Sequence, residues 1–272
     1  MQTPEAFPTR YGPWALVAGA AVGLGAEYAR QIAARGLSVV LVDRDAGPLA
    51  ATAAEIRACG GAVRTLVLDL ARPDVGEAVC AAVADLDIGL LVYNAAIGTV
   101  SPFGELSTTD MQAMLDVNCR GPLFLVHALL PAMVERKHGG IVLMSSMAAN
   151  FGSAQLTVYA ATKAFDLILA EALWAELREH GVDVLAVQPG STRTPGWQSS
   201  QPPELRGPGP HVMEPPDVVR EALATLGVEP TLVPGETNRQ STRMLASLPR
   251  RQAIELISRI TATLRPTGRT LA

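Results

Sequence analysis

Short apolar runs alternate with longer alanine-rich or amphipathic segments along the first 190 residues. The apolar runs predict six strands, at residues 14–18, 37–42, 63–68, 88–93, 141–144 and 182–188. The segment after the glycine-rich turn predicts a helix that ends at about residue 35. The later segments predict helices at residues 46–58, 73–85, 108–136 and 157–179. A seventh short strand is expected at residues 231–233. This order predicts βαβ units, and therefore an α/β fold of the Rossmann-like, doubly wound kind: a mostly parallel seven-stranded sheet with helices on both faces.

Two regions depart from this alternation. Residues 190–216 are rich in proline and glycine, and we expect a long loop over the substrate site, with a disordered insertion as the alternative. Near the C-terminus the pattern predicts a helix from about Thr242 to Leu264, within a helical tail at residues 237–272. The length of 272 residues suits one domain over residues 1–272.

Composition excludes several classes of function. The chain is 49% hydrophobic but only 4% aromatic, which is typical of a core of Ala, Val and Leu around buried strands. A net charge of −4 without a basic run argues against nucleic acid, and apolar runs shorter than about 20 residues argue against a membrane span. Cys59, Cys80 and Cys119 and the four histidines lack metal-ligand spacing. We therefore expect buried thiols, no metal site and a reducing, cytoplasmic location.

A glycine-rich turn follows the first strand, with Gly19, Gly23 and Gly25 at the start of the next helix. Backbone amides at a helix start attract phosphate, and glycines allow a pyrophosphate to approach closely. A tight turn with close helix packing is the alternative for the glycines alone. Asp43 ends the second strand and can accept hydrogen bonds from ribose hydroxyls, which favours NAD. Arg44 keeps NADP as an alternative, because its guanidinium could bind a ribose phosphate.

Tyr159 and Lys163 are one helical turn apart on one predicted helix, and Ser146 lies thirteen residues upstream of the tyrosine. Tyrosine has an ordinary pKa of about 10. An ammonium about 4 Å away is worth roughly 4 kcal/mol at an effective dielectric constant near 20, or about three pKa units. The pair is therefore a candidate for proton transfer. An exposed helical pair is the alternative, and Ser145 competes with Ser146 as the active hydroxyl.

From about Tyr11 to Gly235 the chain resembles the short-chain dehydrogenase/reductase family. The matching pieces are the glycine turn, Asp69, Asn94-Ala95-Ala96, Asn118, Ser146, Tyr159, Lys163 and Pro189-Gly190-Ser-Thr-Arg-Thr194. Tyr-Gly-Pro-Trp-Ala before the first strand and Val233-Pro-Gly near the end resemble bacterial ketone reductases and hydroxysteroid dehydrogenases. Ala18 and Ala96 depart from the usual threonine and glycine, and we expect them to alter stability or cofactor affinity and leave the reaction intact.

The resemblance implies a role for each matching position. Asn118 would kink its helix and position a water in a proton relay, Ser146 would hydrogen-bond the substrate oxygen, and Lys163 would hold the nicotinamide ribose. The expected cofactor contacts are Gly19, Gly23, Leu24, Gly25, Asp43, Arg44, Asp69, Leu70, Asn94, Ala95, Tyr159, Lys163, Pro189, Gly190, Thr192 and Thr194. Asp69 and Leu70 would hold the adenine, Asn94 its ribose, Pro189 to Thr194 the carboxamide, and Thr194 the pyrophosphate. Asp69 could instead form a turn, and Asn118 could be a surface amide.

Ile97, Met147, Phe151, Leu156 and Trp197 are candidates for an apolar substrate wall, although core packing would explain half of them equally well. No Arg or Lys is clearly placed to hold a substrate acid group, so we expect a lipophilic secondary alcohol or ketone, such as a steroid. The leading hypothesis is an NAD-dependent alcohol dehydrogenase or ketone reductase. The alternatives are an NADP-dependent reductase and a non-catalytic nucleotide sensor. The resemblance also implies a homodimer or homotetramer formed through the helices at 108–136 and 157–179.

Overall fold

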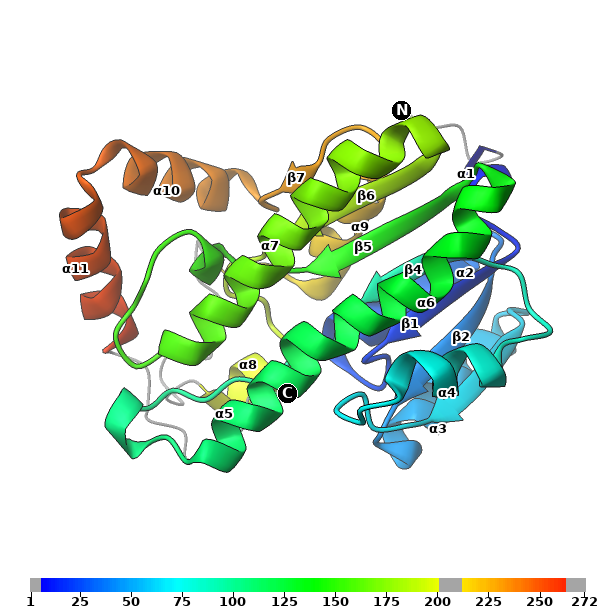
Figure 1. Ribbon diagram of the computed structural model, residues 1–272, viewed down its shortest axis with the longest axis horizontal. Helices are drawn as coiled ribbons and strands as arrows, with labels where there is room; N and C mark the ends of the chain where they lie inside the picture. The colour runs from blue at the N-terminus through cyan, green and yellow to red at the C-terminus, as the bar shows by residue number, and fades with distance from the viewer. Residues whose placement is uncertain (1–5, 201–211, 263–272) are drawn as a thin grey trace.

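The computed structural model describes residues 6–200 and 212–262. Its sheet has seven parallel strands in the spatial order β3-β2-β1-β4-β5-β6-β7 (Figure 1). The strands are β1 (Trp14–Ala18), β2 (Ser38–Asp43), β3 (Val63–Val67), β4 (Ile88–Tyr93), β5 (Gly139–Met144), β6 (Val182–Val187) and β7 (Thr231–Leu232). The strand order reverses at β1, as in a doubly wound fold. The predicted fold class is confirmed, and each strand lies within two residues of its predicted bounds.

Helices cover both faces of the sheet. One layer contains α2 (Gly23–Ala34), α3 (Ala46–Ala58) and α9 (Pro215–Thr225), and the other contains α4 (Val75–Ala82), α6 (Gly121–Arg136) and α7 (Thr157–Leu177). Successive strand residues serve opposite layers. In β1, Val17 shares a buried cluster with Ile32 of α2, whereas Leu16 shares one with Leu125 of α6. Burial on both faces explains why the strands are continuous apolar runs in the sequence.

The helix predicted over residues 108–136 is divided into three parts. α5 (Thr108–Leu115) is followed by a π-helical turn at Asp116–Arg120 and then by α6. Ser107 caps α5 by accepting a hydrogen bond from the amide of Asp110 at 3.0 Å. Pro122 is the second residue of α6 and has no N–H to donate, and the oxygen of Val117, five residues earlier, accepts a hydrogen bond from the Tyr93 hydroxyl at 2.6 Å. The break in the helix therefore occurs at the π-helical turn, which contains Asn118.

Residues Thr108–Arg136 are also the one stretch in the described part of the chain that is long and apolar enough to cross a membrane. In the most apolar window of this stretch, 44% of the residues are buried inside the protein. The core helix of a soluble protein passes the same test, so the stretch is weak evidence for a membrane span.

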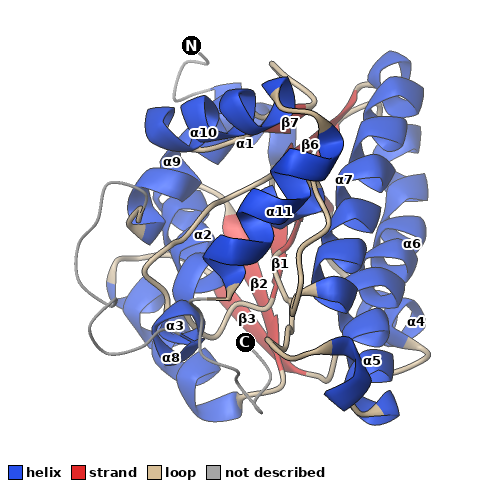
Figure 2. Ribbon diagram, turned by 90° about the vertical axis from the view of Figure 1, so that its left-hand side faces the viewer, coloured by secondary structure: helices blue, strands red, loops and turns tan. Residues whose placement is uncertain are grey.

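The helical tail differs from the prediction of one helix from Thr242 to Leu264. Two helices, α10 (Glu236–Ser247) and α11 (Arg250–Thr261), are separated by Leu248 and Pro249, because proline cannot continue a helix. In Figure 1 they lie at the end of the molecule toward which β5 points, and in Figure 2 α11 lies in front of the sheet. Residues 263–272 of the predicted tail lie outside the described residues.

The predicted loop at 190–216 is partly helical. It contains α8 (Pro195–Ser200), an isolated bridge between Thr192 and Met213, and the start of α9; its residues 201–211 lie outside the described part. The remaining short elements are α1 (Ala6–Tyr11) and 3-10 turns at Phe103–Glu105, Met147–Ala149 and Arg178–His180. The expectation of buried thiols is wrong. Cys59 is exposed, and Cys80 and Cys119 are partly exposed.

Candidate functional site

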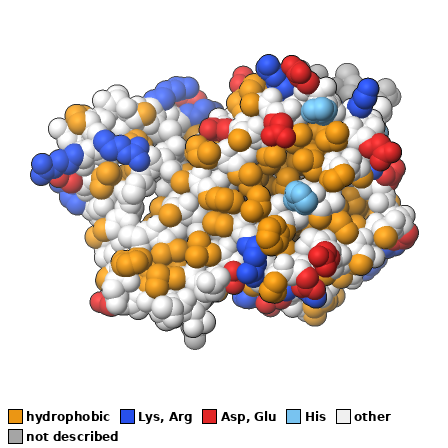
Figure 3. All heavy atoms as spheres, in the orientation of Figure 1, with side chains coloured by type: hydrophobic (Ala, Val, Ile, Leu, Met, Phe, Trp, Pro, Cys, Tyr) orange, Lys and Arg blue, Asp and Glu red, His pale blue; other side chains and the backbone are white. Residues whose placement is uncertain are grey.

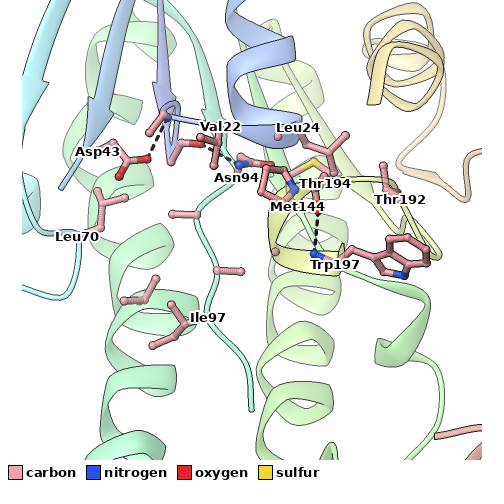
Figure 4. Close-up of a pocket in the computed structure, with 18 of the residues that line it drawn as sticks. Val22, Leu24, Asp43, Leu70, Asn94, Ile97, Met144, Thr192, Thr194 and Trp197 are labelled. Atoms are coloured by element: carbon pink, nitrogen blue, oxygen red, sulfur yellow. Dashed lines mark hydrogen bonds between the residues drawn. The ribbon is translucent and has the colours of Figure 1, made fainter. Parts of the chain in front are cut away.

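A cavity of about 310 Å³ opens at the carboxyl edge of the sheet, where a doubly wound fold binds its ligand. Its lining includes the predicted residues Gly19, Gly23, Leu24, Asp43, Arg44, Asp69, Leu70, Asn94, Ala95, Ile97, Ser146, Tyr159, Lys163, Pro189, Gly190, Thr192, Thr194 and Trp197. Figure 4 shows Asp43 and Leu70 on one side of the cavity and Thr194 and Trp197 on the other. Residues from five strand ends and from the segment after β3 thus line one space.

The glycine turn is held by a close approach of backbone to backbone. Gly19 has a left-handed φ of +81°, and its carbonyl accepts a hydrogen bond from the Asn94 side chain at 3.0 Å. Gly25 does not line the cavity. It lies behind the turn, where a Cβ atom would be 1.8 Å from the Gly19 oxygen. The cofactor contact at Gly25 stays a prediction, and the structure gives this glycine a packing role, because the absence of a Cβ atom allows α2 to pack against the turn.

Asp43 connects the end of β2 to the glycine turn. Its Oδ2 accepts a hydrogen bond from the amide of Ala21 at 3.0 Å, and its Oδ1 accepts one from the amide of Asp45 at 3.1 Å. The carboxylate is thus fixed in the wall of the cavity beside Arg44. Asp69 lines the same cavity while its Oδ1 accepts from the amide of Ala71 at 2.9 Å, which is the turn-forming role that the sequence left open.

The two serines after β5 have different environments. Ser145 is buried, and its hydroxyl donates to the main-chain oxygen of Lys163 at 2.7 Å. Ser146 caps the 3-10 turn that follows, accepting from the amide of Ala148 at 3.2 Å, and lines the cavity. The hydroxyl hydrogen bond of Ser145 therefore links the end of β5 to α7. Ser146 keeps its own O–H for a group in the cavity.

Lys163 is almost completely buried, with 2% of its surface exposed. Its Nζ donates to the main-chain oxygen of Met144 at 2.7 Å and to Oδ2 of Asp166 at 3.0 Å. Burial opposes the ammonium form, but attraction by Asp166 and Tyr159 outweighs it and raises the pKa of Lys163 above its ordinary value of 10.5. Sequence reasoning missed Asp166. Its spacing of three residues from Lys163 on one helix was the available signal.

Tyr159 lies on α7 one turn before Lys163 and lines the same cavity. Its ring packs against the backbone of Gly98, where a Cβ atom would be 2.6 Å from the ring. This contact fixes the ring in the cavity wall. The tyrosine, the lysine and Ser146 thus line one space, as the motif spacing predicts.

Asn118 is completely buried and does not line the cavity. Its Oδ1 accepts from the amide of Ile97 at 2.9 Å, and its Nδ2 donates to the oxygen of Ile97 at 2.8 Å and to Oγ1 of Thr162 at 3.0 Å. The alternative of a surface amide is wrong. These three hydrogen bonds fasten the π-helical turn to α7 and to the segment after β4, so the amide has no donor left for a water.

The five residues predicted for an apolar substrate wall are divided by the cavity lining, and their contact with a substrate stays a prediction. Ile97 and Trp197 line the cavity, but Met147, Phe151 and Leu156 do not. The segment at residues 150–154 packs on α11: the oxygen of Asn150 accepts a hydrogen bond from Arg250, and the amide of Ala154 donates one to Ser258. Arg250 also lies over the Phe151 ring, 4.9 Å from its centroid. These contacts lie far apart in the sequence, so local patterns carried no signal for them.

Several lining residues were missed, and most flank a motif that the sequence revealed. They are Ala21, Val22, Asp45, Leu68, Ala96, Val117, Met144, Ser145, Pro195 and Gly196. Of the two unusual residues, Ala96 lines the cavity, and Ala18 accepts hydrogen bonds from the amides of Asn94 and Ala95. Within residues 6–200 and 212–262, no group of three or more His, Cys, Asp or Glu side chains could hold a metal ion.

A family model described as short chain dehydrogenase matches residues 13–205. The chain is 29% identical over 255 residues to the 7beta-hydroxysteroid dehydrogenase of Clostridium sardiniense, covering 93% of this chain and 97% of that protein. A solved structure from work on 7beta-hydroxysteroid dehydrogenase stereoselectivity has a TM-score of 0.85 at 30% identity, covering 92% of this chain and 98% of its own. A short-chain dehydrogenase from Sphingobium yanoikuyae, solved in complex with NADPH, has a TM-score of 0.73 at 30% identity, covering 95% and 98%.

The packing of Gly25 predicts the outcome of its replacement. In Gly25→Ala the added methyl group would overlap the Gly19 oxygen and displace the turn, so we expect dinucleotide affinity to fall by about tenfold or more. Fluorescence titration with NAD and NADP measures the affinity. Gly47→Ala is the matched control, because nothing lies within 4 Å of a Cβ atom there. Equal affinity of wild type and Gly25→Ala would show that the turn does not hold the dinucleotide.

Proposed function

This chain belongs to the short chain dehydrogenase family and is an oxidoreductase with a nicotinamide cofactor, and we propose that it interconverts a secondary alcohol and a ketone with NAD. The hypothesis of a non-catalytic nucleotide sensor is set aside, since the relatives are named as dehydrogenases and reductases. One observation carries the proposal. Ser146, Tyr159 and Lys163 line the same cavity as the glycine turn and Asp43. A proton donor, a hydroxyl partner and a cation thus border the space that suits a dinucleotide.

The residues present fit a nicotinamide dinucleotide. The glycine turn would hold the pyrophosphate, Asp43 the adenosine ribose, and Lys163 the nicotinamide ribose through its remaining N–H. When bound, the nicotinamide supplies the hydride chemistry. In oxidation Tyr159 takes the proton of the substrate hydroxyl, and in reduction it returns a proton to the oxygen. Ser146 donates a hydrogen bond to that oxygen as negative charge develops on it.

NAD is the cofactor that we propose, because the fixed carboxylate of Asp43 would repel a phosphate on the adenosine ribose. NADP is the second candidate. Arg44 also lines this end of the cavity, and the relative from Sphingobium yanoikuyae was solved with NADPH. The choice between NAD and NADP therefore depends on whether repulsion of a ribose phosphate by Asp43 outweighs its attraction by Arg44.

The substrate that we propose is lipophilic, with a steroid as the leading example. Among the described lining residues, Asp43, Arg44, Asp45 and Asp69 place their charges at the adenosine end, and Lys163 is neutralised by Asp166. Two further lining residues, Ile97 and Trp197, are apolar or largely apolar. A neutral ring system would lose little solvation beside them, whereas a substrate acid group would lack a cation. The relatives named 7beta-hydroxysteroid dehydrogenase support this choice.

We also propose that the chain forms a homodimer or homotetramer through the helices at residues 108–136 and 157–179, which comprise α5, α6 and α7. Apolar side chains gather over these helices in Figure 3. The exposed members in this region include Leu115, Leu123, Phe124, Phe165 and Ile168. A patch of this kind on a protein surface commonly marks an interface, and a second copy offers the same patch to cover it.

A reducing, cytoplasmic location is part of the proposal. Cys59, Cys80 and Cys119 are all free thiols, and Cys59 is exposed to solvent. Exposed free thiols are typical of compartments in which glutathione or thioredoxin keeps cysteine reduced.

Tyr159→Phe tests the proton transfer. Removal of one hydroxyl should lower turnover by about a hundredfold or more and leave dinucleotide affinity nearly unchanged. The measurement is the absorbance of reduced nicotinamide across a panel of ketones and secondary alcohols, with both cofactors. Tyr28→Phe is the control, because it removes the same atom from a buried ring that contacts the Met144 sulfur. Full activity in Tyr159→Phe would remove the tyrosine from the mechanism.

Asp43→Ala tests the cofactor choice. Loss of the carboxylate should improve the affinity for NADP relative to NAD by about tenfold, which corresponds to about 1.4 kcal/mol. Titration of both dinucleotides gives the ratio. Asp45→Ala removes a neighbouring charge that does not bind the glycine turn, and a smaller change is expected there. An unchanged ratio in Asp43→Ala would favour the NADP alternative.

Ile168→Arg tests the proposed interface. Ile168 is 61% exposed on α7, and a buried, unpaired guanidinium would oppose association. Analytical ultracentrifugation should detect a multimer in the wild type and a monomer in the variant. Val228→Arg provides a control at 64% exposure, outside this patch. Identical sedimentation of wild type and Ile168→Arg would place the interface elsewhere.

A further inference from the structure

Asp166 is a buried carboxylate that lies behind the cavity wall and has no role in the reaction described above. It is on α7, and its Oδ2 is 3.0 Å from Nζ of Lys163. The exposed fraction of each of the two side chains is 3%. Its other oxygen, Oδ1, is buried and has no hydrogen-bond partner among the described residues. Removing a carboxylate from water has a high free-energy cost unless a cation or hydrogen-bond donors compensate it, so the buried position of Asp166 calls for an explanation.

The titratable groups around the pair come from β4, the π-helical turn and α7. Tyr93 of β4 faces Asp166 and donates its hydroxyl hydrogen bond to the Val117 oxygen at 2.6 Å. Burial raises the pKa of Tyr93 well above its ordinary value, and Asp166, Cys119 and Asp69 contribute in that order. Both facts keep this phenol neutral at physiological pH.

The remaining neighbours are Cys119 of the π-helical turn and Tyr159 of α7. Burial raises the pKa of the Cys119 thiol to about 11, so this group is also neutral near pH 7. Burial raises the pKa of the Asp166 carboxyl, and the ammonium of Lys163, 3.0 Å away, opposes that rise, so among these neighbours Asp166 is the group that can face Lys163 as an anion. Met144 supplies a neutral carbonyl only.

A buried ammonium without an anionic partner gives up its proton readily, because burial can lower the pKa of a lysine by several units. Proton transfer by Tyr159 and contact with a nucleotide ribose both use the charged form of Lys163. We infer that Asp166 is a positioning residue that keeps Lys163 protonated and directs its Nζ to the end of β5, an inference whose catalytic meaning rests on the proposed function. Two of the three N–H groups are then fixed by Met144 and Asp166, and the third remains for the nucleotide.

The sequence allows a direct measurement of the lysine charge. Lys137 and Lys163 are the two lysines of the chain, and Lys137 is exposed. Protein labelled with ¹³C at the lysine ε-carbon should therefore give two NMR signals, and Lys137→Arg assigns them. In the wild type the Lys163 signal should not titrate below pH 10.5. In Asp166→Asn its midpoint should shift down by about two pH units or more.

Three variants control the measurement. Asp166→Ser is a second neutral variant and should produce the same shift, and Asp166→Glu should restore the high midpoint. Glu171→Gln removes an exposed carboxylate from the same helix and should leave the signal unchanged. Circular dichroism establishes that each variant is folded. Dinucleotide affinity of Asp166→Asn should equal that of the wild type below the new midpoint and decline above it.

Two results would overturn the inference: a wild-type Lys163 midpoint below the ordinary value of 10.5, or an unchanged midpoint in the folded neutral variants. The wild-type titration decides even if both neutral variants fail to fold. The lysine signal needs neither substrate nor turnover. A chain that shows the expected shift but binds no dinucleotide would refute the proposed function and leave the role of Asp166 standing.

Discussion

The hydrogen bond from Nζ of Lys163 to the main-chain oxygen of Met144 joins α7 to the end of β5, and the arrangement of the site depends on it. A second bond, from the Ser145 hydroxyl to the Lys163 carbonyl, fixes the same turn of the helix. Since Ser146 follows directly and Tyr159 lies one turn earlier on α7, both side chains meet in the cavity wall. The parallel sheet brings the glycine turn and Asp43 to the same edge.

This arrangement places the ammonium group of Lys163 in the interior of the protein, away from solvent. Water cannot stabilise the Lys163 ammonium there, so a carboxylate must lie beside it, and Asp166 does. Removing one partner of a buried ion pair typically destabilises a protein by about 3–5 kcal/mol. The pair therefore contributes to the fold and to the chemistry at once. It also weakens the field of the lysine at Tyr159 relative to a bare ammonium, an effect that the sequence pattern of tyrosine and lysine alone does not reveal.

Features that depend on local sequence could be predicted. The strands are apolar runs because both faces of the sheet are buried, and the glycine turn and Asp43 could be recognised because each follows a strand directly. Features that depend on distant contacts could not. The segment with Phe151 packs on α11, about 100 residues away, and no local pattern in the sequence indicates this contact. The kink at Asn118 is expected from the family resemblance, but the hydrogen bonds that fasten it to Ile97 and Thr162 leave no trace in the periodicity of the sequence.

The central claim is that this cavity carries out hydride exchange between a secondary alcohol and a nicotinamide dinucleotide. The most direct measurement uses an active alcohol from the substrate panel with deuterium on its carbinol carbon, followed by mass spectrometry of the recovered dinucleotide. With the reaction run in ordinary water, we expect the reduced dinucleotide to carry one deuterium, because the hydride passes directly from the alcohol and does not exchange with solvent hydrogen. Reduced dinucleotide that carries hydrogen from the solvent, or no change in the dinucleotide while the alcohol is consumed, would contradict the account.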